Sequence, residues 1–331
     1  MPYSWGMSTI DTALTRHAGV EVPVICGPMF PCSNPELVAA VSEAGGLGMI
    51  QPMSLTSIHG YEFRAGLQYI RSLTDNPVGM NLLLEHGFQK YQKRMDEWIA
   101  IALEEGVRFF LTALGNPAEM VKRIHGEGGI VYHDVINRGF GRKARDGGVD
   151  GLVCVNGNAG GHAGRMTPQE LYEALADLDL PLVCAGGISQ PAEARAMLEM
   201  GYVGVQMGSR FIATEECNVH PDYKQAILDA VAEDIVLTEK ISGVPVAVIG
   251  NEAVRRMGTH ASGLAKKLLR HPRTKKWMRM FYLMKSTRSL PSSSYKGSSY
   301  AQFYQAGRSV GGIDRVVPAG DVVRAFAEGL R

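Results

Sequence analysis

Three glycine-rich segments and one histidine are the residues of this chain best suited to chemistry. Gly157–Gly164 reads Gly-Asn-Ala-Gly-Gly-His-Ala-Gly and holds His162 between glycines, while Gly186-Gly187 and Gly208-Ser209 each follow a short apolar run. Glycine lets a phosphate group approach backbone N–H groups, because no side chain intervenes. A histidine can transfer a proton or donate a hydrogen bond near neutral pH. The pattern therefore predicts a phosphate-bearing ligand beside an acid–base residue.

Each of these features also has a purely structural interpretation. A histidine between glycines can stabilise a loop, and the glycines at 186, 187 and 208 suit ordinary turns. Two successive apolar runs end in glycine, and a helix begins after each of them. This arrangement favours phosphate binding. The pattern is not a Rossmann fingerprint, because no G-x-G-x-x-G opens the first helix after Gly27.

Eight short apolar runs alternate with helical stretches, and the glycine segments follow the last three runs. The predicted strands are 22–27, 47–50, 78–83, 108–112, 129–133, 151–155, 181–185 and 204–207. Strands this apolar suit a parallel sheet buried on both faces. Eight strand-then-helix units favour an α/β fold of the (β/α)8 barrel type over a doubly wound sheet. Such a barrel carries its site on the loops after its strands and often binds phosphate after strands seven and eight.

The bulk composition is that of a globular enzyme. The chain has 331 residues, a hydrophobic fraction of 45% and a formal net charge of +1, values that argue against disorder. No apolar run approaches the roughly 20 residues of a membrane span, and the first residues lack a signal-peptide pattern. The five cysteines form no CxxC pair, so we expect reduced thiols, a cytoplasmic protein and no metal site.

The composition divides the chain into three parts. We expect residues 1–222 to form the barrel and residues 223–306 to form a smaller, mainly helical second domain, with 223–239 helical. Residues 307–331 should return to the barrel through a final helix. Within the second part, the basic residues of segment 255–288 meet no Asp or Glu, and apolar residues are interleaved at helical spacing.

The basic segment 255–288 has three interpretations. It is a solvated helix face, or it binds an anionic partner such as acyl carrier protein, a CoA thioester or an NADPH phosphate. The third interpretation is nucleic-acid binding, which is the least favoured because no nucleic-acid motif or aromatic platform accompanies the charge. The sequence alone leaves the first two open.

The three glycine motifs together resemble those of the nitronate monooxygenases. They are Ala159-Gly-Gly-His-Ala-Gly164, Cys184-Ala-Gly-Gly-Ile188 and Gly204-Val-Gln-Met-Gly-Ser-Arg-Phe211, in this order at strand ends. FMN-dependent type II enoyl-ACP reductases and NADH:quinone reductases share the pattern. The resemblance implies FMN in a TIM barrel and oxidation of alkyl nitronates with O2 through reduced flavin. The alternatives are a reductase that uses NADH or NADPH on a quinone or enoyl thioester, and a non-catalytic flavin-binding protein.

The resemblance also implies roles for individual residues. His162 matches the catalytic histidine, which orients the nitro group or acts as a base. Flavin contacts are implied for Pro28, Met29, Asn81, His133, Gly160, Gly161, Gly186, Gly187, Gln206, Met207, Gly208 and Ser209.

Three positions depart from the family pattern. Asn158 stands where many members have Glu, Asp134 where relatives often have Lys, and Arg308 where Gln is common. His133 and Asp134 could also be a structural pair. The departures bear on the substrate more than on the cofactor.

Overall fold

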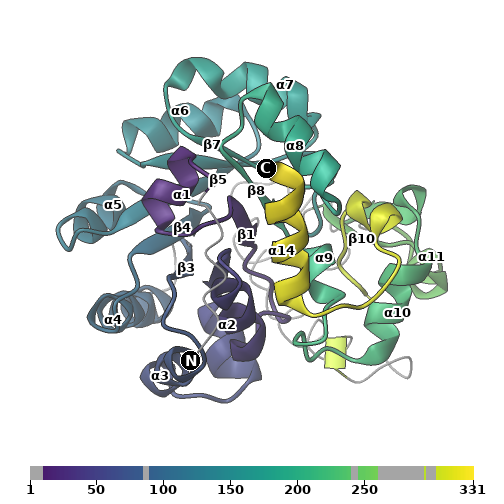
Figure 1. Cartoon of the computed structure of the whole chain (residues 1–331), viewed down its shortest axis with the longest axis horizontal. Coiled ribbons are helices and arrows are strands. Elements are labelled where there is room, and N and C mark those ends of the chain that lie inside the picture. The colour runs from purple at the N-terminus through teal and green to yellow at the C-terminus, as the bar shows by residue number, and fades with distance from the viewer. Residues whose placement is uncertain (1–9, 85–88, 240–244, 260–293, 296–302) are drawn as a thin grey trace.

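The computed structural model describes residues 10–84, 89–239, 245–259, 294–295 and 303–331. Eight parallel strands close into a barrel in the order β1 to β8 (Figure 1). They are β1 Val24–Cys26, β2 Leu47–Ile50, β3 Val78–Leu83, β4 Phe109–Ala113, β5 Ile130–Val135, β6 Gly151–Val155, β7 Leu182–Ala185 and β8 Gly204–Met207. The predicted (β/α)8 barrel is confirmed, and the bounds of β2, β3, β6 and β8 are those expected from the sequence.

Most of the described helices surround the barrel. They are α1 Ala13–Ala18, α2 Pro35–Glu43, α3 Phe63–Leu73, α4 Gln89–Glu104, α5 Ala118–His125, α6 Arg138–Asp146, α7 Pro168–Leu175, α8 Pro191–Met200, α9 Ser209–Ile212, α10 Pro221–Asp229, α11 Glu252–Met257 and α14 Ala319–Leu330. Proline in the first turn and a capping box fix the starts of α7 and α8. A π-helical turn, Ser54–Ile58, precedes α3, where a longer single helix was expected from residue 57.

The strands bury two separate apolar layers. One layer fills the barrel interior and includes Ile25, Met49, Leu111, Tyr132 and Val153. The other lies between the strands and the helices. Successive side chains of a strand point to opposite faces, so each strand supplies both layers. This alternation decides which residues at the strand ends can face a ligand held over the interior.

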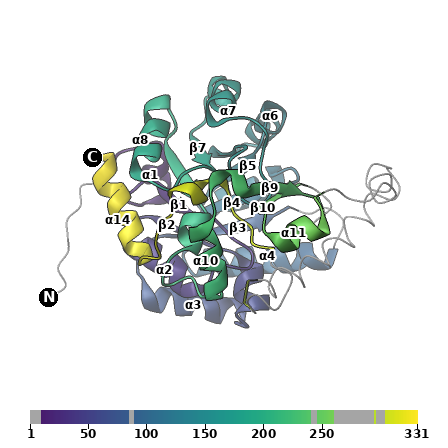
Figure 2. The ribbon, with the colours of Figure 1, turned by 90° about the vertical axis from the view of Figure 1, so that its right-hand side faces the viewer.

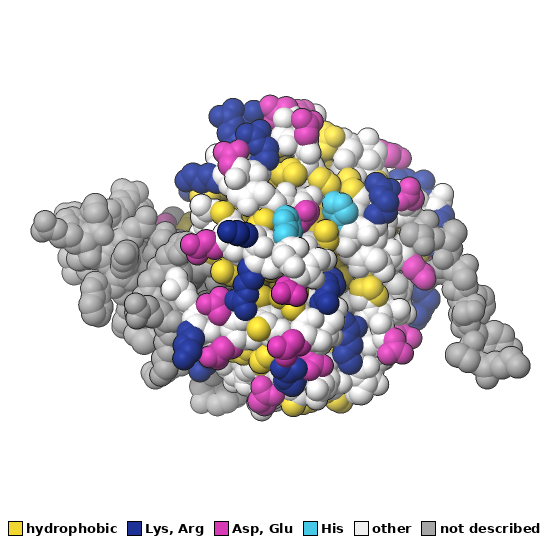
Figure 3. Space-filling model, turned by 90° about the vertical axis from the view of Figure 1, so that its left-hand side faces the viewer, with side chains coloured by type: hydrophobic (Ala, Val, Ile, Leu, Met, Phe, Trp, Pro, Cys, Tyr) yellow, Lys and Arg dark blue, Asp and Glu magenta, His cyan; other side chains and the backbone are white. Residues whose placement is uncertain are grey.

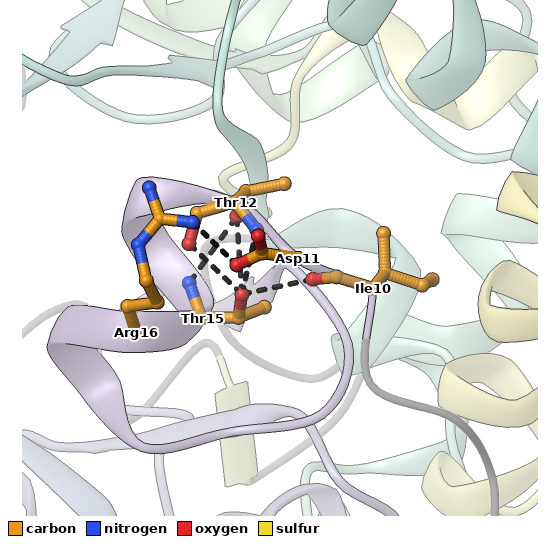
Figure 4. A network of polar contacts seen from close by, with 5 residues as sticks. All are labelled: Ile10, Asp11, Thr12, Thr15 and Arg16. Atoms are coloured by element: carbon orange, nitrogen blue, oxygen red, sulfur yellow. Dashed lines mark hydrogen bonds and ion pairs between the residues drawn. The ribbon is translucent and has the colours of Figure 1, made fainter.

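Helix α1 closes the amino-terminal end of the barrel. Its Leu14 and Ala18 belong to the interior layer. Thr12 and Thr15 form a capping box at its start, and Thr15 Oγ1 donates to the Ile10 carbonyl at 2.8 Å (Figure 4). Arg16 pairs with Asp11 in the same network. With this end closed by packed side chains, the carboxyl ends of the strands remain for a ligand site.

The second part of the chain contains strands as well as helices. Helix α10 ends at Asp229, and β9 Ile235–Thr238 pairs antiparallel with β10 Val246–Ile249. Figure 2 shows this pair with α10 and α11 in front of the barrel strands. The expectation of a helix over 223–239 is wrong beyond Asp229, because Ile235-Val-Leu-Thr238 is a strand-forming run. Most of the basic segment 255–288 lies outside the described residues.

The C-terminal helix α14 packs against α2 and α8 (Figure 1). Lys and Arg side chains are intermixed with Asp and Glu on the face that carries α4 and α5 (Figure 3). Within the described ranges, no helix is both long and apolar enough to cross a membrane. All five cysteines are buried free thiols.

Candidate active site at the carboxyl ends of the strands

Asn156 organises the loop that follows β6. The residue is fully buried, and its Nδ2 donates to the Gly186 carbonyl at 2.9 Å. Its Oδ1 accepts from the Asn158 N–H at 2.8 Å, and its own carbonyl accepts from the Gly164 N–H at 3.1 Å. One amide side chain therefore joins the loops after β6 and β7.

The same loop holds His162 at the carboxyl end of the barrel. Gly161 pairs with Ala247 of β10 in an antiparallel bridge, with the Ala247 N–H donating to the Gly161 carbonyl at 2.7 Å. The His162 side chain is exposed, and desolvation by nearby protein lowers its pKa. The imidazole is thus mainly neutral at pH 7, the form that accepts a proton.

Gly160 lies against the backbone of the returning C-terminal segment. A Cβ on Gly160 would lie 2.9 Å from the Gly307 nitrogen, and one on Gly307 would lie 2.6 Å from the Asn158 carbonyl oxygen. The Arg308 N–H donates to that oxygen at 2.9 Å, and the Gly307 N–H donates to Ser209 Oγ at 2.9 Å. The C-terminal segment therefore braces the His162 loop through backbone contacts that only glycine permits.

The glycines after β7 and β8 meet different surroundings. Gly186 has a φ of 113°, and its Cβ would lie 2.5 Å from the Ala159 nitrogen. Gly187 has a φ of 83°, and its Cβ would lie 3.0 Å from Asn158 Cβ. A Cβ on Gly208 would make ordinary contact with Met29 Sδ at 3.4 Å. A side chain would thus be strained and crowded at Gly186 and Gly187, whereas Gly208, the N-cap of α9, has room for a Cβ.

Two amide side chains face the barrel interior near its carboxyl end. Asn81 is buried, and its Nδ2 donates to the Leu111 carbonyl at 3.1 Å. Gln206 is in register with Ile25 of β1, an interior residue. Gln206 Oε1 is buried and has no hydrogen-bond partner in the described structure. Pro28 and Met29 are half-buried on the loop after β1.

The alternation of β5 separates His133 from Asp134. Tyr132 belongs to the interior layer, so His133 points outward, and its Nδ1 lies 2.7 Å from Thr112 Oγ1. Burial lowers the pKa of His133 to about 4. Asp134 is in register with Val153, an interior residue, and therefore points inward. Burial raises the pKa of Asp134 to about 7.

The residues predicted from the sequence thus divide into two groups. At the carboxyl ends of the strands the structure brings together His162 with Pro28, Met29, Asn81, Gly160, Gly161, Gly186, Gly187, Gln206, Gly208 and Ser209. The side chains of His133 and Met207 lie on the outer faces of their strands, Met207 in the layer beneath the helices. Flavin contact by any of them stays a prediction. Asn156 and Gly307 were not predicted to build the site, and for Asp134 a functional and a structural role were both left open.

Comparison with known proteins decides the family. A family model described as nitronate monooxygenase matches residues 11–329. This chain belongs to the nitronate monooxygenase family. It is therefore an oxidoreductase of a flavin-dependent family, as the resemblance of its glycine motifs indicated.

Individual relatives are similar along most of the chain. A 5-hydroxy-7a-methyl-1-oxo-octahydro-1H-indene-4-carboxyl-CoA dehydrogenase of Rhodococcus jostii is 29% identical over 252 residues, which are 76% of this chain and 69% of the relative. A nitronate monooxygenase of Pseudomonas aeruginosa is 29% identical over 278 residues, 69% of this chain and 77% of the relative. The structure of FabK from Thermotoga maritima has a TM-score of 0.80 at 26% identity, and the match covers 97% of this chain and 96% of that one.

Proposed function

We propose that this chain is an FMN-dependent nitronate monooxygenase with its flavin over the carboxyl end of the barrel. The observation that carries the proposal is that buried polar atoms face this end without partners. Gln206 Oε1 and Asp134 Oδ1 have no hydrogen-bond partner among the described residues. Buried polar atoms are nearly always paired, so two orphans at one end of an interior indicate a polar ligand. A flavin ring offers both donors and acceptors at its edge.

The chain offers a matching place for the FMN phosphate. The N-cap of α9 is a glycine, Gly208, which supplies no capping side chain, and a Cβ there would make only ordinary contact with Met29 Sδ at 3.4 Å. Ser209 Oγ accepts from the Gly307 N–H, which leaves its own hydroxyl hydrogen available to donate. We assign the phosphate to Gly208 and Ser209, with Gly187 on the neighbouring loop. Gly186 contributes by packing against Ala159 rather than by leaving space.

His162 is the residue that would act on the substrate. Its neutral imidazole accepts a proton from the carbon next to a nitro group, or donates a hydrogen bond to the nitro group of a nitronate that is already ionised. FMN, when bound, would supply the redox chemistry between the substrate and O2. The bridge between Gly161 and Ala247 fixes the loop, so His162 is held in position before substrate binds.

An anaerobic titration of the purified holoprotein tests the proposal. Denaturation should release FMN, and propionate 3-nitronate should bleach the flavin absorbance without NADH or NADPH. Oxygen uptake should then accompany turnover of the nitronate. A protein that cannot be reconstituted with FMN contradicts the cofactor assignment. A flavin bleached by NADH or NADPH but by no nitronate contradicts the substrate assignment and supports the reductase alternative.

A second candidate is the oxidation of an acyl-CoA thioester. The Rhodococcus relative and a Mycobacterium tuberculosis relative, 28% identical over 265 residues, are both named as carboxyl-CoA dehydrogenases. Two large apolar side chains are exposed directly after the ends of β4 and β5, namely Leu114 and Ile136. Exposed apolar side chains at these positions suit a carbon skeleton larger than a small nitronate. Bleaching by an alicyclic acyl-CoA, compared with free CoA, tests this candidate. The basic segment 255–288 as a CoA or acyl-carrier contact stays a prediction.

A further inference from the structure

Asp134 occupies the last inward-facing position of β5. Tyr132, two residues earlier on the same face, belongs to the interior layer, and Val131 and Val135 belong to the outer layer. The register partner of Asp134 on β6 is Val153, which is also interior. In a parallel sheet, residues in register point to the same face. The Asp134 side chain therefore points into the barrel interior near the C-terminal ends of the strands. Its strand, β5, neighbours β6, which leads into the His162 loop.

Asp134 is half-buried as a residue, but one oxygen of its carboxyl group, Oδ1, has no compensation for its burial. Oδ1 has no accessible surface and no hydrogen-bond partner, and no ion pair involves Asp134 within the described ranges. An unpaired carboxylate in such a place is strongly disfavoured, so the group takes up a proton instead. Burial raises its pKa to about 7. A neutral carboxylic acid has one O–H donor to offer a ligand.

The neighbouring titratable groups do not account for the raised pKa of Asp134. On β5 itself these are Tyr132 below and His133 on the outer face, and β6 contributes Cys154, also on the outer face. The loop after β6 contributes His162. Strand β4, Phe109–Ala113, contributes none, and helices α5 and α6 pack outside the strand, so their charges face away from the interior. Burial is accordingly the cause of the shift, and each of these groups is neutral near pH 7.

We propose that Asp134 contacts the flavin and donates a hydrogen bond from its protonated carboxyl group to an acceptor atom of the ring. The inference rests on the proposed function for the identity of the ligand. A ligand with an acceptor at this point gives Asp134 Oδ1 the partner that the described residues do not supply. Binding then couples to protonation, because only the acid form donates.

The dissociation constant of FMN as a function of pH tests the inference. Flavin fluorescence quenching on the flavin-free protein gives Kd for wild type and for Asp134→Asn, whose amide keeps a donor but does not titrate. The ratio of the wild-type Kd to the variant Kd should rise about tenfold between about pH 6 and about pH 8. Taking the ratio removes the titration of the FMN phosphate, whose second pKa is about 6. A ratio that stays constant, or falls with pH, overturns the inference.

A control variant and an infrared measurement distinguish a failure of this inference from misfolding of the variant and from a failure of the proposed function. Asp146→Asn, an exposed carboxylate at the end of α6 with 66% side-chain exposure, is the matched control and should behave as wild type. Infrared difference spectra of the flavin-free protein should show the carbonyl stretch of one protonated carboxylic acid at about pH 6 that disappears in Asp134→Asn. Absence of that band overturns the inference even if the variant does not fold. Absence of FMN binding in all variants and wild type, with the band present, contradicts the proposed function instead.

Discussion

Thr112 Oγ1 and His133 Nδ1 lie 2.7 Å apart on the outer face of the barrel, and this contact orients the end of β5. Thr112 Oγ1 also donates its single hydrogen to the Tyr132 carbonyl at 3.0 Å. When the hydroxyl hydrogen goes to this carbonyl, the hydroxyl accepts from His133, and Nδ1 then carries the proton of the neutral imidazole. With His133 fixed outward, Asp134 is the residue of this strand end that faces the interior.

Removing the Thr112 hydroxyl should leave the His133 N–H without a hydrogen-bond acceptor. Thr112→Val keeps the volume and leaves a buried N–H without its partner, which should lower the free energy of unfolding by about 1–3 kcal/mol. Urea unfolding of Thr112→Val, His133→Leu and the double variant measures the coupling. The double variant should be more stable than the sum of the single effects predicts. Additive effects would mean that the two side chains do not interact in solution.

In the flavin-free protein, His133 and Asp134 should affect the pH dependence of the free energy of unfolding with opposite signs. The pKa of Asp134 is raised to about 7, so its protonated form favours the native state at low pH. This contribution is complete below the ordinary pKa of about 4 and is lost as pH rises to about 7. Relative to Asp134→Asn, wild type should lose at most about 4 kcal/mol across this range, since each pKa unit corresponds to about 1.4 kcal/mol.

For His133 the sign is reversed. Its pKa is lowered to about 4, so the unfolded chain binds a proton before the native state does. Wild type should lose stability relative to His133→Gln as pH falls from about 6.5 to about 4, by at most about 3 kcal/mol. Guanidinium unfolding at several pH values, with each variant compared at matched pH, resolves the two slopes. A flat difference for either variant would show that its group titrates normally.

The barrel itself was predictable because its signals are local. The runs Leu47–Ile50, Val78–Leu83, Gly151–Val155 and Gly204–Met207 are apolar, short and bounded by glycine, proline or a polar residue, and they form strands with those bounds. The glycine segments after the last three strands lie at one end of the barrel, because parallel strands bring their carboxyl ends together.

The face that each strand-end residue occupies was not predicted from the sequence. Both residues of His133-Asp134 end the same strand, and the residue types alone favour neither for the interior. Successive side chains of β5 alternate between its two faces, and Tyr132 faces the interior, so His133 faces outward and Asp134 faces inward. The bracing contact between Gly160 and Gly307 joins segments nearly 150 positions apart, and no local pattern specifies it. Strand β9 was read as helix because its four residues follow directly on a helical pattern.

The glycines of the candidate site should respond differently to substitution. Gly208→Ala adds a Cβ in ordinary contact with Met29 Sδ and should change the free energy of unfolding by less than about 0.5 kcal/mol. Gly186→Ala places a Cβ 2.5 Å from the Ala159 nitrogen at a φ of 113° and should destabilise by more than about 2 kcal/mol. Thermal unfolding of the flavin-free proteins measures both.

The larger variant Gly208→Leu separates folding from phosphate binding. Its backbone conformation is accessible to any residue, and the longer side chain should occupy the space assigned to the phosphate. We expect a folded barrel with little or no bound FMN, and Gly208→Ala serves as its control. Full flavin occupancy in Gly208→Leu would show that the phosphate lies elsewhere.

His162 should matter more for neutral nitroalkanes than for nitronates. Loss of general-base participation is typically worth about 10²- to 10⁴-fold, so His162→Ala and His162→Asn should slow oxidation of a neutral nitroalkane within that range. A nitronate is already ionised, so it loses only a hydrogen bond and should be affected less. FMN content should be unchanged, because His162 is exposed on the loop after β6 and is not assigned to the phosphate. Stopped-flow bleaching of the flavin by both substrates, under anaerobic conditions, gives the reductive rates directly. Equal and nearly wild-type rates on both substrates would remove His162 from the mechanism, whereas equal large losses would assign it to substrate binding rather than proton transfer.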